Sequence, residues 1–302
     1  MDSEIPQGCR QTPQDGWRCL WPLSCELGEG PVWVVRDQSL WFVDIEAPAI
    51  HRFDPASGDR FSWTPPCRVG SIAPRATGGF VAGTERGFAL VDPVAGTFEP
   101  IDHPERHLPT NRFNDGKVDP AGAFWAGTMD DNKQAAQGSL YRLGPDLEWV
   151  RKDDGYRITN GPAFSPDGTV IYHTDTVERR IYAFDLAADG TLSDKRVLID
   201  WPHDCGNPDG MTVDAQGYLW VACWGGWGVR RVSPSGQIVA SFDLPCANIT
   251  SCAFGGPDLD RLFVTSARQA LDADQLEAQP LAGGLFELFP GVRGCPPVEF
   301  AG

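Results

Sequence analysis

The sequence lacks any long apolar run. None of its 302 residues belongs to a stretch of 18 apolar residues, about the length that a membrane-spanning helix needs. Residues 1–23 are polar, contain Asp2, Glu4 and Asp15, and lack the apolar segment of a signal peptide. We therefore expect a cytoplasmic protein with no membrane partner.

Several sequence signatures of catalytic or metal sites are also missing. The nine cysteines are odd in number and show no C-x-x-C spacing, which predicts reduced thiols and excludes zinc-finger and disulfide scaffolds. There is no G-x-S-x-G, G-x-G-x-x-G, P-loop or H-E-x-x-H motif. His103 and His107 are four residues apart but lie in a proline-containing loop, where we expect solvated side chains. His173 falls in an expected strand and is interpreted as an interior, hydrogen-bonded histidine.

Positive charge is scarce. The chain has 25 Lys and Arg residues against 41 Asp and Glu residues, which gives a formal net charge of −16. Such a chain repels phosphate backbones and anionic membrane surfaces, so a nucleic-acid partner is excluded. A small neutral substrate and a bound cation are both compatible with this charge.

Turn-forming and aromatic residues are abundant. The 34 glycines, 26 prolines and 11 tryptophans, together with the near absence of amphipathic helical patterns, predict an all-β protein. A turn followed by an apolar aromatic strand recurs six times, at a spacing of roughly 40 to 48 residues that matches a four-stranded propeller blade. The six recurring strands begin at residues 40, 80, 124, 171, 219 and 262.

This period predicts a six-bladed β-propeller. A β-sandwich has similar turns but lacks so long a repeat. Six units fill the chain from about residue 24 to residue 289. We therefore expect an N-terminal tail over residues 1–23 and one propeller domain over residues 24–302, with no room for a second domain.

One position of the repeat carries polar residues in several blades. The residue just before a glycine, roughly ten residues ahead of the aromatic strand, converges on the propeller axis. It is Glu29, Asp115, Asn160 or Asp209 in four blades, while the second and sixth blades offer Val69 and Ser251. Turns favour Asn and Asp before glycine for conformational reasons, but this does not explain Glu29.

Acidic side chains gathered on an axis predict a bound cation, because they repel one another without one. Their oxygen ligands point first to Ca²⁺, Mg²⁺ or Mn²⁺. Arg112 stands between Asn111 and Asn114 just ahead of the third aromatic strand. Its spacing is compatible either with a surface salt bridge or with a donor that holds a substrate oxygen.

The motifs at these positions resemble those of the regucalcin and gluconolactonase family, which includes the senescence marker protein and sugar lactonases. The resemblance runs from about residue 27 to residue 286. It rests on residues 27–31 (LGEGP), 111–119 (NRFNDGKVD), 124–129 (FWAGTM), 159–162 (TNGP), 208–211 (PDGM), 254–257 (FGGP) and 282–286 (AGGLF).

The resemblance implies that Glu29, Asn160 and Asp209 hold one divalent metal ion, with Asp209 also acting as the base. It further implies that Arg112 and Asn114 contact the substrate. Under the same resemblance Asp115 supports the site without binding the metal.

One loop departs from the animal members of the family. Asn132 stands where those members have a glutamate, which puts sugar contacts from this loop in doubt. Residues 173–176 (HTDT) and 224–226 (WGG) look more like bacterial pentonolactonases. That likeness adds Fe²⁺ to the candidate ions, which are then Fe²⁺, Ca²⁺, Mn²⁺ and Zn²⁺.

The function expected from these observations is metal-dependent hydrolysis of a small-molecule sugar lactone, namely xylono-, arabinono- or gluconolactone. Two alternatives stay open. One is a phosphotriesterase-like hydrolase on the same scaffold, and the other is a non-catalytic calcium-binding regulator. Asp209, Glu29 or a metal hydroxide is a candidate for the base, and the sequence leaves the oligomeric state open.

Overall fold

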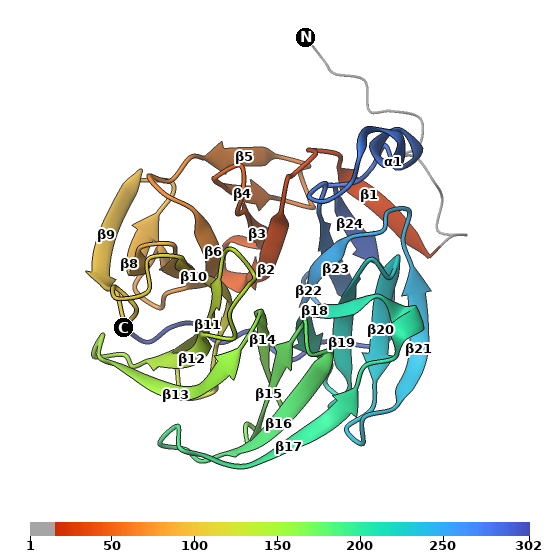
Figure 1. The fold of residues 1–302 in the computed structure, drawn as a ribbon. Coiled ribbons are helices and arrows are strands. Elements are labelled where there is room, and N and C mark those ends of the chain that lie inside the picture. Colours follow the sequence, from red (N-terminus) through yellow and green to blue (C-terminus); the bar gives the residue numbers. More distant parts are fainter. Residues whose placement is uncertain (1–15) are drawn as a thin grey trace.

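The computed structural model describes residues 16–302, which form six four-stranded antiparallel sheets arranged as blades around a central axis (Figure 1). The six-bladed β-propeller predicted from the repeat is confirmed. The recurring aromatic strands are the second strands of the blades. The polar positions before the glycines lie on the first strands.

Five blades are each built from four strands that follow one another in the chain. Blade 1 contains β2 (Gly28–Val34), β3 (Ser39–Asp44), β4 (Ala49–Phe53) and β5 (Arg60–Trp63). Blade 2 contains β6 (Val69–Pro74), β7 (Phe80–Thr84), β8 (Gly87–Asp92) and β9 (Thr97–Asp102). Blade 3 contains β10 (Asn111–Val118), β11 (Phe124–Asp130), β12 (Gly138–Leu143) and β13 (Trp149–Tyr156). Blade 4 contains β14 (Thr159–Phe164), β15 (Val170–Asp175), β16 (Arg180–Leu186) and β17 (Leu192–Asp200). Blade 5 contains β18 (Asn207–Val213), β19 (Leu219–Trp224), β20 (Gly228–Val232) and β21 (Ile238–Asp243).

The sixth blade joins the two ends of the described chain. It contains β22 (Ile249–Gly255), β23 (Arg261–Ser266), β24 (Leu285–Leu288) and, as its outer strand, β1 (Trp17–Trp21). The helices are short: α1 (Ala273–Ala278) and the 3₁₀ turns η3 (Val35–Asp37) and η4 (His203–Cys205).

The domain boundary predicted at residue 24 is wrong, because β1 belongs to the propeller. β1 pairs with β24 in the register Trp17 to Leu288 and Cys19 to Phe286. Its hydrogen bonds cover what would otherwise be an open sheet edge. Residues 1–15 of the predicted tail lie outside the described residues.

Aromatic side chains pack in the interfaces between blades. Trp41 of blade 1 meets Phe80 of blade 2 with ring centroids 4.8 Å apart. Phe88 of blade 2 meets Phe113 of blade 3 at 4.4 Å. Such contacts explain why the repeat is rich in aromatics, because each blade buries its faces against its neighbours.

Buried tryptophans are held by aspartates of the preceding turns. The carboxylate of Asp119 accepts a hydrogen bond from Trp125 Nε1 at 2.7 Å, and that of Asp214 accepts one from Trp220 Nε1 at 2.9 Å. Asp214 also forms an ion pair with Arg231 at 2.7 Å. The Asp-x₅-Trp spacing therefore satisfies a buried indole in blades 3 and 5.

Every first strand contains a bulge where it pairs with the second strand. In blade 1, Glu29 pairs with Val43 and Val32 pairs with Trp41. Between these two pairs β2 advances by three residues and β3 by only two. A bulge of this kind turns side chains away from the regular alternation. The bulges lie at the level of the polar positions found in the sequence.

The C-terminal segment crosses one end of the axis. At its start the Ala215 amide of blade 5 donates to the Arg293 carbonyl at 2.8 Å, and at its end the Phe300 amide donates to the Pro74 carbonyl of blade 2 at 2.8 Å. Phe300 is fully buried and anchors the segment. The segment covers the axis at the end where the first strands finish.

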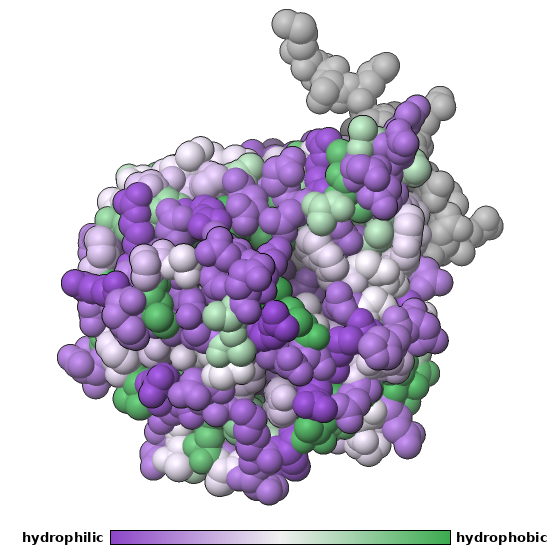
Figure 2. All heavy atoms as spheres, in the orientation of Figure 1, coloured by the Kyte–Doolittle hydropathy of each residue, from purple (hydrophilic) through white to green (hydrophobic). Residues whose placement is uncertain are grey.

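The outer surface carries no broad apolar area on the face seen in Figure 2, where hydrophobic residues are scattered among hydrophilic ones. None of the helices in residues 16–302 has the length and hydropathy to span a bilayer. Seven cysteines of this part of the chain are free thiols: Cys25, Cys67, Cys205, Cys223, Cys246, Cys252 and Cys295.

His173 on β15 differs from its prediction in one respect. It is interior, as expected, but neither ring nitrogen has a hydrogen-bond partner among the described residues. Its ring packs edge-on against Tyr156 at 4.6 Å. Burial lowers the pKa of His173 to about 3, so the folded protein holds a neutral imidazole at pH values where an unfolded chain takes up a proton.

The lowered pKa of His173 predicts that the folded protein loses stability in acid. It also predicts that one substitution removes this loss. Between pH 6.5 and pH 3 the unfolded state binds one more proton at His173 than the folded state, so stability falls as the pH falls. His173→Phe should abolish this contribution, which amounts to about 1.4 kcal/mol per pH unit. We expect the parent to lose about 2–3 kcal/mol more than the variant between pH 6.5 and pH 4.5, measured by urea unfolding. Parallel pH profiles of the two proteins would contradict the assignment.

Candidate functional site

Four blades present polar side chains at the same level of the axis. Glu29 lies on β2, Asp115 on β10, Asn160 on β14 and Asp209 on β18, each within or next to the bulge of its strand. Their exposed fractions are 4%, 6%, 1% and 6%. Residues that are far apart in the sequence are thus brought together in a buried setting.

The three carboxyl groups of this set influence one another. Burial raises the pKa of Glu29 well above its usual value, and the charges of Asp209 and Asp115 raise it further. Burial and the charge of Asp115 likewise raise the pKa of Asp209. Burial also raises the pKa of Asp115, to about 6. A cation among these groups would remove the repulsion and favour their ionised forms.

The amide of Asn160 has a defined orientation. Its Nδ2 donates to Thr176 Oγ1 at 2.8 Å, and its Oδ1 accepts a hydrogen bond from Asn114 Nδ2 at 3.2 Å. Thr176 follows β15 in the same blade. This bonding directs the oxygen of Asn160, and not its nitrogen, toward the neighbouring blade 3.

Asp115 is held by backbone amides on both of its oxygens. Gly116 N donates to Oδ1 at 2.7 Å and Gly161 N donates to Oδ2 at 2.9 Å, so Asp115 ties β10 to β14. Lys117 on the same strand donates from Nζ to the Met211 carbonyl of β18 at 2.8 Å. Asp115 and Lys117 therefore connect blade 3 to blades 4 and 5 by hydrogen bonds.

Arg112 is buried, with 4% exposure, and is not a surface residue. Its Nε donates to Asp131 Oδ1 at 2.8 Å and its Nη1 donates to Asn114 Oδ1 at 2.7 Å. Among the described residues Nη2 makes no hydrogen bond, so it is the group of Arg112 that can donate to a ligand. Arg112 also lies close enough to Glu29 for its charge to lower the pKa of that carboxyl.

Asn114 links the arginine to the axis. Its oxygen accepts from Arg112, while its Nδ2 donates to the Thr159 carbonyl at 2.8 Å as well as to Asn160. Both ends of this amide are therefore engaged within the protein. Asn114 orients Arg112 and Asn160 at once.

The buried polar side chains on the axis could hold a metal ion only through oxygen atoms. In residues 16–302, no three His, Cys, Asp or Glu side chains are grouped to hold a metal ion. The third acidic residue near Glu29 and Asp209 is Asp115, which is occupied by backbone amides. The remaining set is two buried carboxylates and the oriented amide oxygen of Asn160. All three are hard oxygen donors and fit a divalent ion of the Ca²⁺, Mg²⁺ or Mn²⁺ type.

The loop that follows β11 lies close enough to the polar cluster to affect its electrostatics. Lys133 of that loop is exposed, and its charge lowers the pKa of the buried Asp209. The loop is shaped by Asp130, whose carboxylate accepts hydrogen bonds from the amides of Asn132, Gln134 and Ala135.

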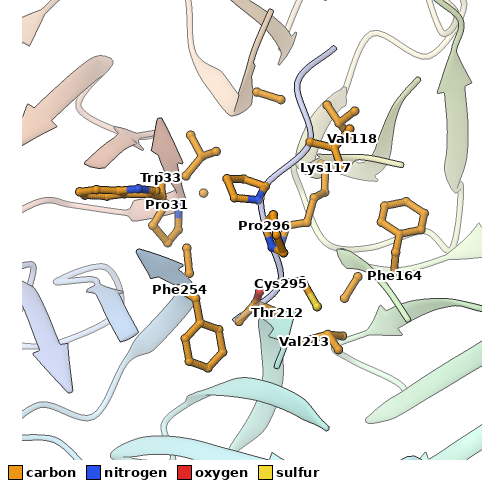
Figure 3. A pocket seen from close by; sticks show the side chains of 18 of the residues that line it. Pro31, Trp33, Lys117, Val118, Phe164, Thr212, Val213, Phe254, Cys295 and Pro296 are labelled. Atoms are coloured by element: carbon orange, nitrogen blue, oxygen red, sulfur yellow. The ribbon is translucent and has the colours of Figure 1, made fainter. Parts of the chain in front are cut away.

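A cavity of about 420 Å³ occupies the opposite end of the axis (Figure 3). Trp33, Val118, Phe254 and the C-terminal segment around Pro296 line it. Asp115 and Lys117 also line it, whereas Glu29, Arg112, Asn114, Asn160 and Asp209 do not, so the cavity meets the polar cluster only at Asp115. Ser251, the sixth-blade counterpart of the polar positions, faces this cavity.

Sequence reasoning missed several groups that hold the cluster. Thr176 orients Asn160, the Thr159 carbonyl holds Asn114, and Asp131 binds Arg112. Thr176 lies in a segment, residues 173–176, that the sequence had marked only by resemblance. Lys117 lies in the motif at residues 111–119, to which the sequence assigned no bracing role, and Asp131 gave no signal because its partners are distant in the chain.

The chain is similar to known proteins over most of its length. Residues 27–268 match the family model described as SMP-30/Gluconolactonase/LRE-like region. Regucalcin of Danio rerio is 40% identical over 289 residues, which cover 94% of this chain and 98% of the relative.

Two solved structures extend the comparison. One is described as a calcium-binding protein, regucalcin, from Agrobacterium tumefaciens, with 32% identity and a TM-score of 0.89 over 93% of this chain and 96% of that one. The other, a luciferin-regenerating enzyme, has 33% identity and a TM-score of 0.86 over 93% of this chain and 97% of that one. The propeller, its polar axis and these matches agree: the chain belongs to the SMP-30/gluconolactonase/LRE-like family.

Proposed function

We propose that the protein is a metal-dependent lactonase that hydrolyses sugar aldonolactones to aldonic acids. One observation carries this proposal: the buried oxygens of Glu29, Asn160 and Asp209 lie next to a buried arginine that has a free donor. This arrangement can bind a cation and a polar, uncharged ring side by side. Membership in a family whose name includes gluconolactonases supports the same activity.

The metal would be held by Glu29, Asn160 and Asp209. A divalent ion bound there would polarise the lactone carbonyl and make the attacking water more acidic. The relative from Agrobacterium tumefaciens is described as calcium-binding, which supports Ca²⁺ among the candidates that also include Mn²⁺, Zn²⁺ and Fe²⁺.

The protein's own residues account for the remaining steps. Asp209 takes the proton of the attacking water as general base, with Glu29 as the alternative. Nη2 of Arg112 donates to the substrate oxygen on which negative charge develops. Asn114, which the resemblance assigns to the substrate, holds Arg112 and Asn160 in place in this proposal. Water adds to the carbonyl carbon, the ring C–O bond breaks, and the ring oxygen receives a proton to become a hydroxyl group.

The proposed substrates are five-carbon lactones, xylono- or arabinonolactone, ahead of gluconolactone. The support for this order is the likeness of residues 173–176 and 224–226 to pentonolactonases, together with the contact of Thr176 to Asn160. A panel of the three lactones, assayed with metal-stripped protein and each of Ca²⁺, Mn²⁺, Zn²⁺ and Fe²⁺, tests the proposal. If none of these ions supports hydrolysis above the spontaneous rate, the proposal is overturned and the non-catalytic calcium-binding alternative is favoured. Turnover of a phosphotriester alone would favour the other hydrolase.

The metal site gives a prediction on content and stability. The parent should carry close to one divalent ion, measured by elemental analysis, and Asp209→Ala should lose it while staying folded. Metal at about 100 times its dissociation constant should stabilise the parent by roughly 2.7 kcal/mol, because it binds only the folded state. Arg231→Ala, which alters an ion pair at the opposite end of β18, should keep its metal and serves as a control. Full metal content in a variant with Glu29, Asn160 and Asp209 all changed to Ala would exclude this site.

The substrate contact gives a prediction on kinetics. Arg112→Ala should keep the metal and lower kcat/KM by about ten- to a hundredfold, the effect of losing a hydrogen bond from a charged donor. Asp209→Asn keeps an oxygen ligand but removes the base, so it should abolish turnover while retaining part of the metal. If Arg112→Ala opens all three lactones as fast as the parent, Arg112 does not contact the substrate.

A further inference from the structure

Arg112 belongs to an ion-pair network that extends beyond the candidate site. Asp131, on the loop after β11, accepts from Arg112 Nε with Oδ1 and from Arg68 Nη2 with Oδ2, both at 2.8 Å. Both oxygens of this carboxylate are thus bound by arginines. Burial acts to raise the pKa of Asp131, but the hydrogen bonds from Arg68 and Arg112 hold it below its usual value.

Arg68 is itself held by three blades. It lies just ahead of β6, and its guanidinium meets Glu85 of blade 2 at 2.8 Å, Glu46 of blade 1 at 3.3 Å and Asp131 of blade 3 at 2.8 Å. Its carbonyl accepts the amide of Glu85 at 3.1 Å, which fixes its backbone as well. A planar guanidinium can meet several carboxylates in fixed directions, which a single ammonium cannot.

The geometry points to Arg68 as a positioning residue: we infer that Arg68, acting through Asp131, sets the position and the available charge of Arg112. This inference rests on the lactonase activity proposed above. Without Arg68, the Asp131 carboxylate loses the donor on Oδ2 and can turn away from its present orientation. It would also pair with Arg112 alone, which would neutralise more of the charge that Arg112 offers to the substrate.

The burial of the members explains why this link matters for the site. The side chain of Arg112 is 4% exposed, whereas those of Arg68 and Asp131 are 24% and 32% exposed. Arg68 therefore lies nearer the surface and does not take part in the buried cluster. A displacement of the reacting groups by about 1 Å can cost up to a hundredfold in rate, so a residue that orients Arg112 affects catalysis without touching the substrate.

The test is a double-mutant cycle measured as kcat/KM on the best lactone of the panel. Arg68→Met should lower kcat/KM by about three- to thirtyfold, divided between kcat and KM in the same way as for Arg112→Ala. Arg68→Lys should restore part of this loss. In the Arg112→Ala background, Arg68→Met should change kcat/KM less than twofold, because its effect passes through Arg112.

Controls separate positioning from loss of fold. Arg231→Met removes a comparable arginine ion pair at the opposite end of the axis and should leave kcat/KM within about twofold of the parent. Metal content and melting temperature are measured for every variant, so that an unfolded Arg68→Met sample is recognised and Arg68→Lys then decides the result.

The two possible failures are distinct. A parent protein that opens no lactone overturns the proposed function. An active parent whose kcat/KM is unchanged in Arg68→Met, or falls by the same factor with and without Arg112, overturns the positioning role.

Discussion

The repulsion among buried carboxylates on the axis is the constraint on which the site depends. Glu29, Asp115 and Asp209 all have raised pKa values because burial and neighbouring negative charge disfavour ionisation. The protein offsets this for Asp115 with two backbone amides and Lys117. Glu29 accepts the backbone amide of Gly30 at 2.9 Å and Asp209 that of Gly210, so in the described chain each of these two proposed ligands has fewer protein donors than Asp115.

The bulges in the first strands determine how this set of side chains is presented. A regular strand would alternate its side chains between two faces, and neighbouring blades would direct different residues to the axis. One extra residue at the same level of each blade brings Glu29, Asn160 and Asp209 to one height. Site geometry is therefore a property of the backbone, and the outer network around Arg68 adjusts only the side chain of Arg112.

The repeat in the sequence was sufficient to predict the six blades and the polar positions, because period and turn chemistry are local. It misplaced the domain boundary, since β1 stands outside the period as the displaced outer strand of the sixth blade. It also missed the ion pair of Arg68 with Asp131, whose members are 63 residues apart. Side-chain partners from different blades leave no spacing signal, and the unbonded interior nitrogens of His173 leave none either.

The pairing of β1 with β24 has a consequence for how the chain acquires its structure. It joins Trp17 to Leu288, about 270 residues apart, so it is a contact of very high sequence separation. During synthesis the first five blades can form in order, but the ring stays open until β24 has emerged. Until then β1 is an unpaired strand of five residues with two tryptophans. Such a strand can pair with any exposed sheet edge. The step that completes the ring is thus also the one in which newly made chains are most exposed to exchanging strands with one another.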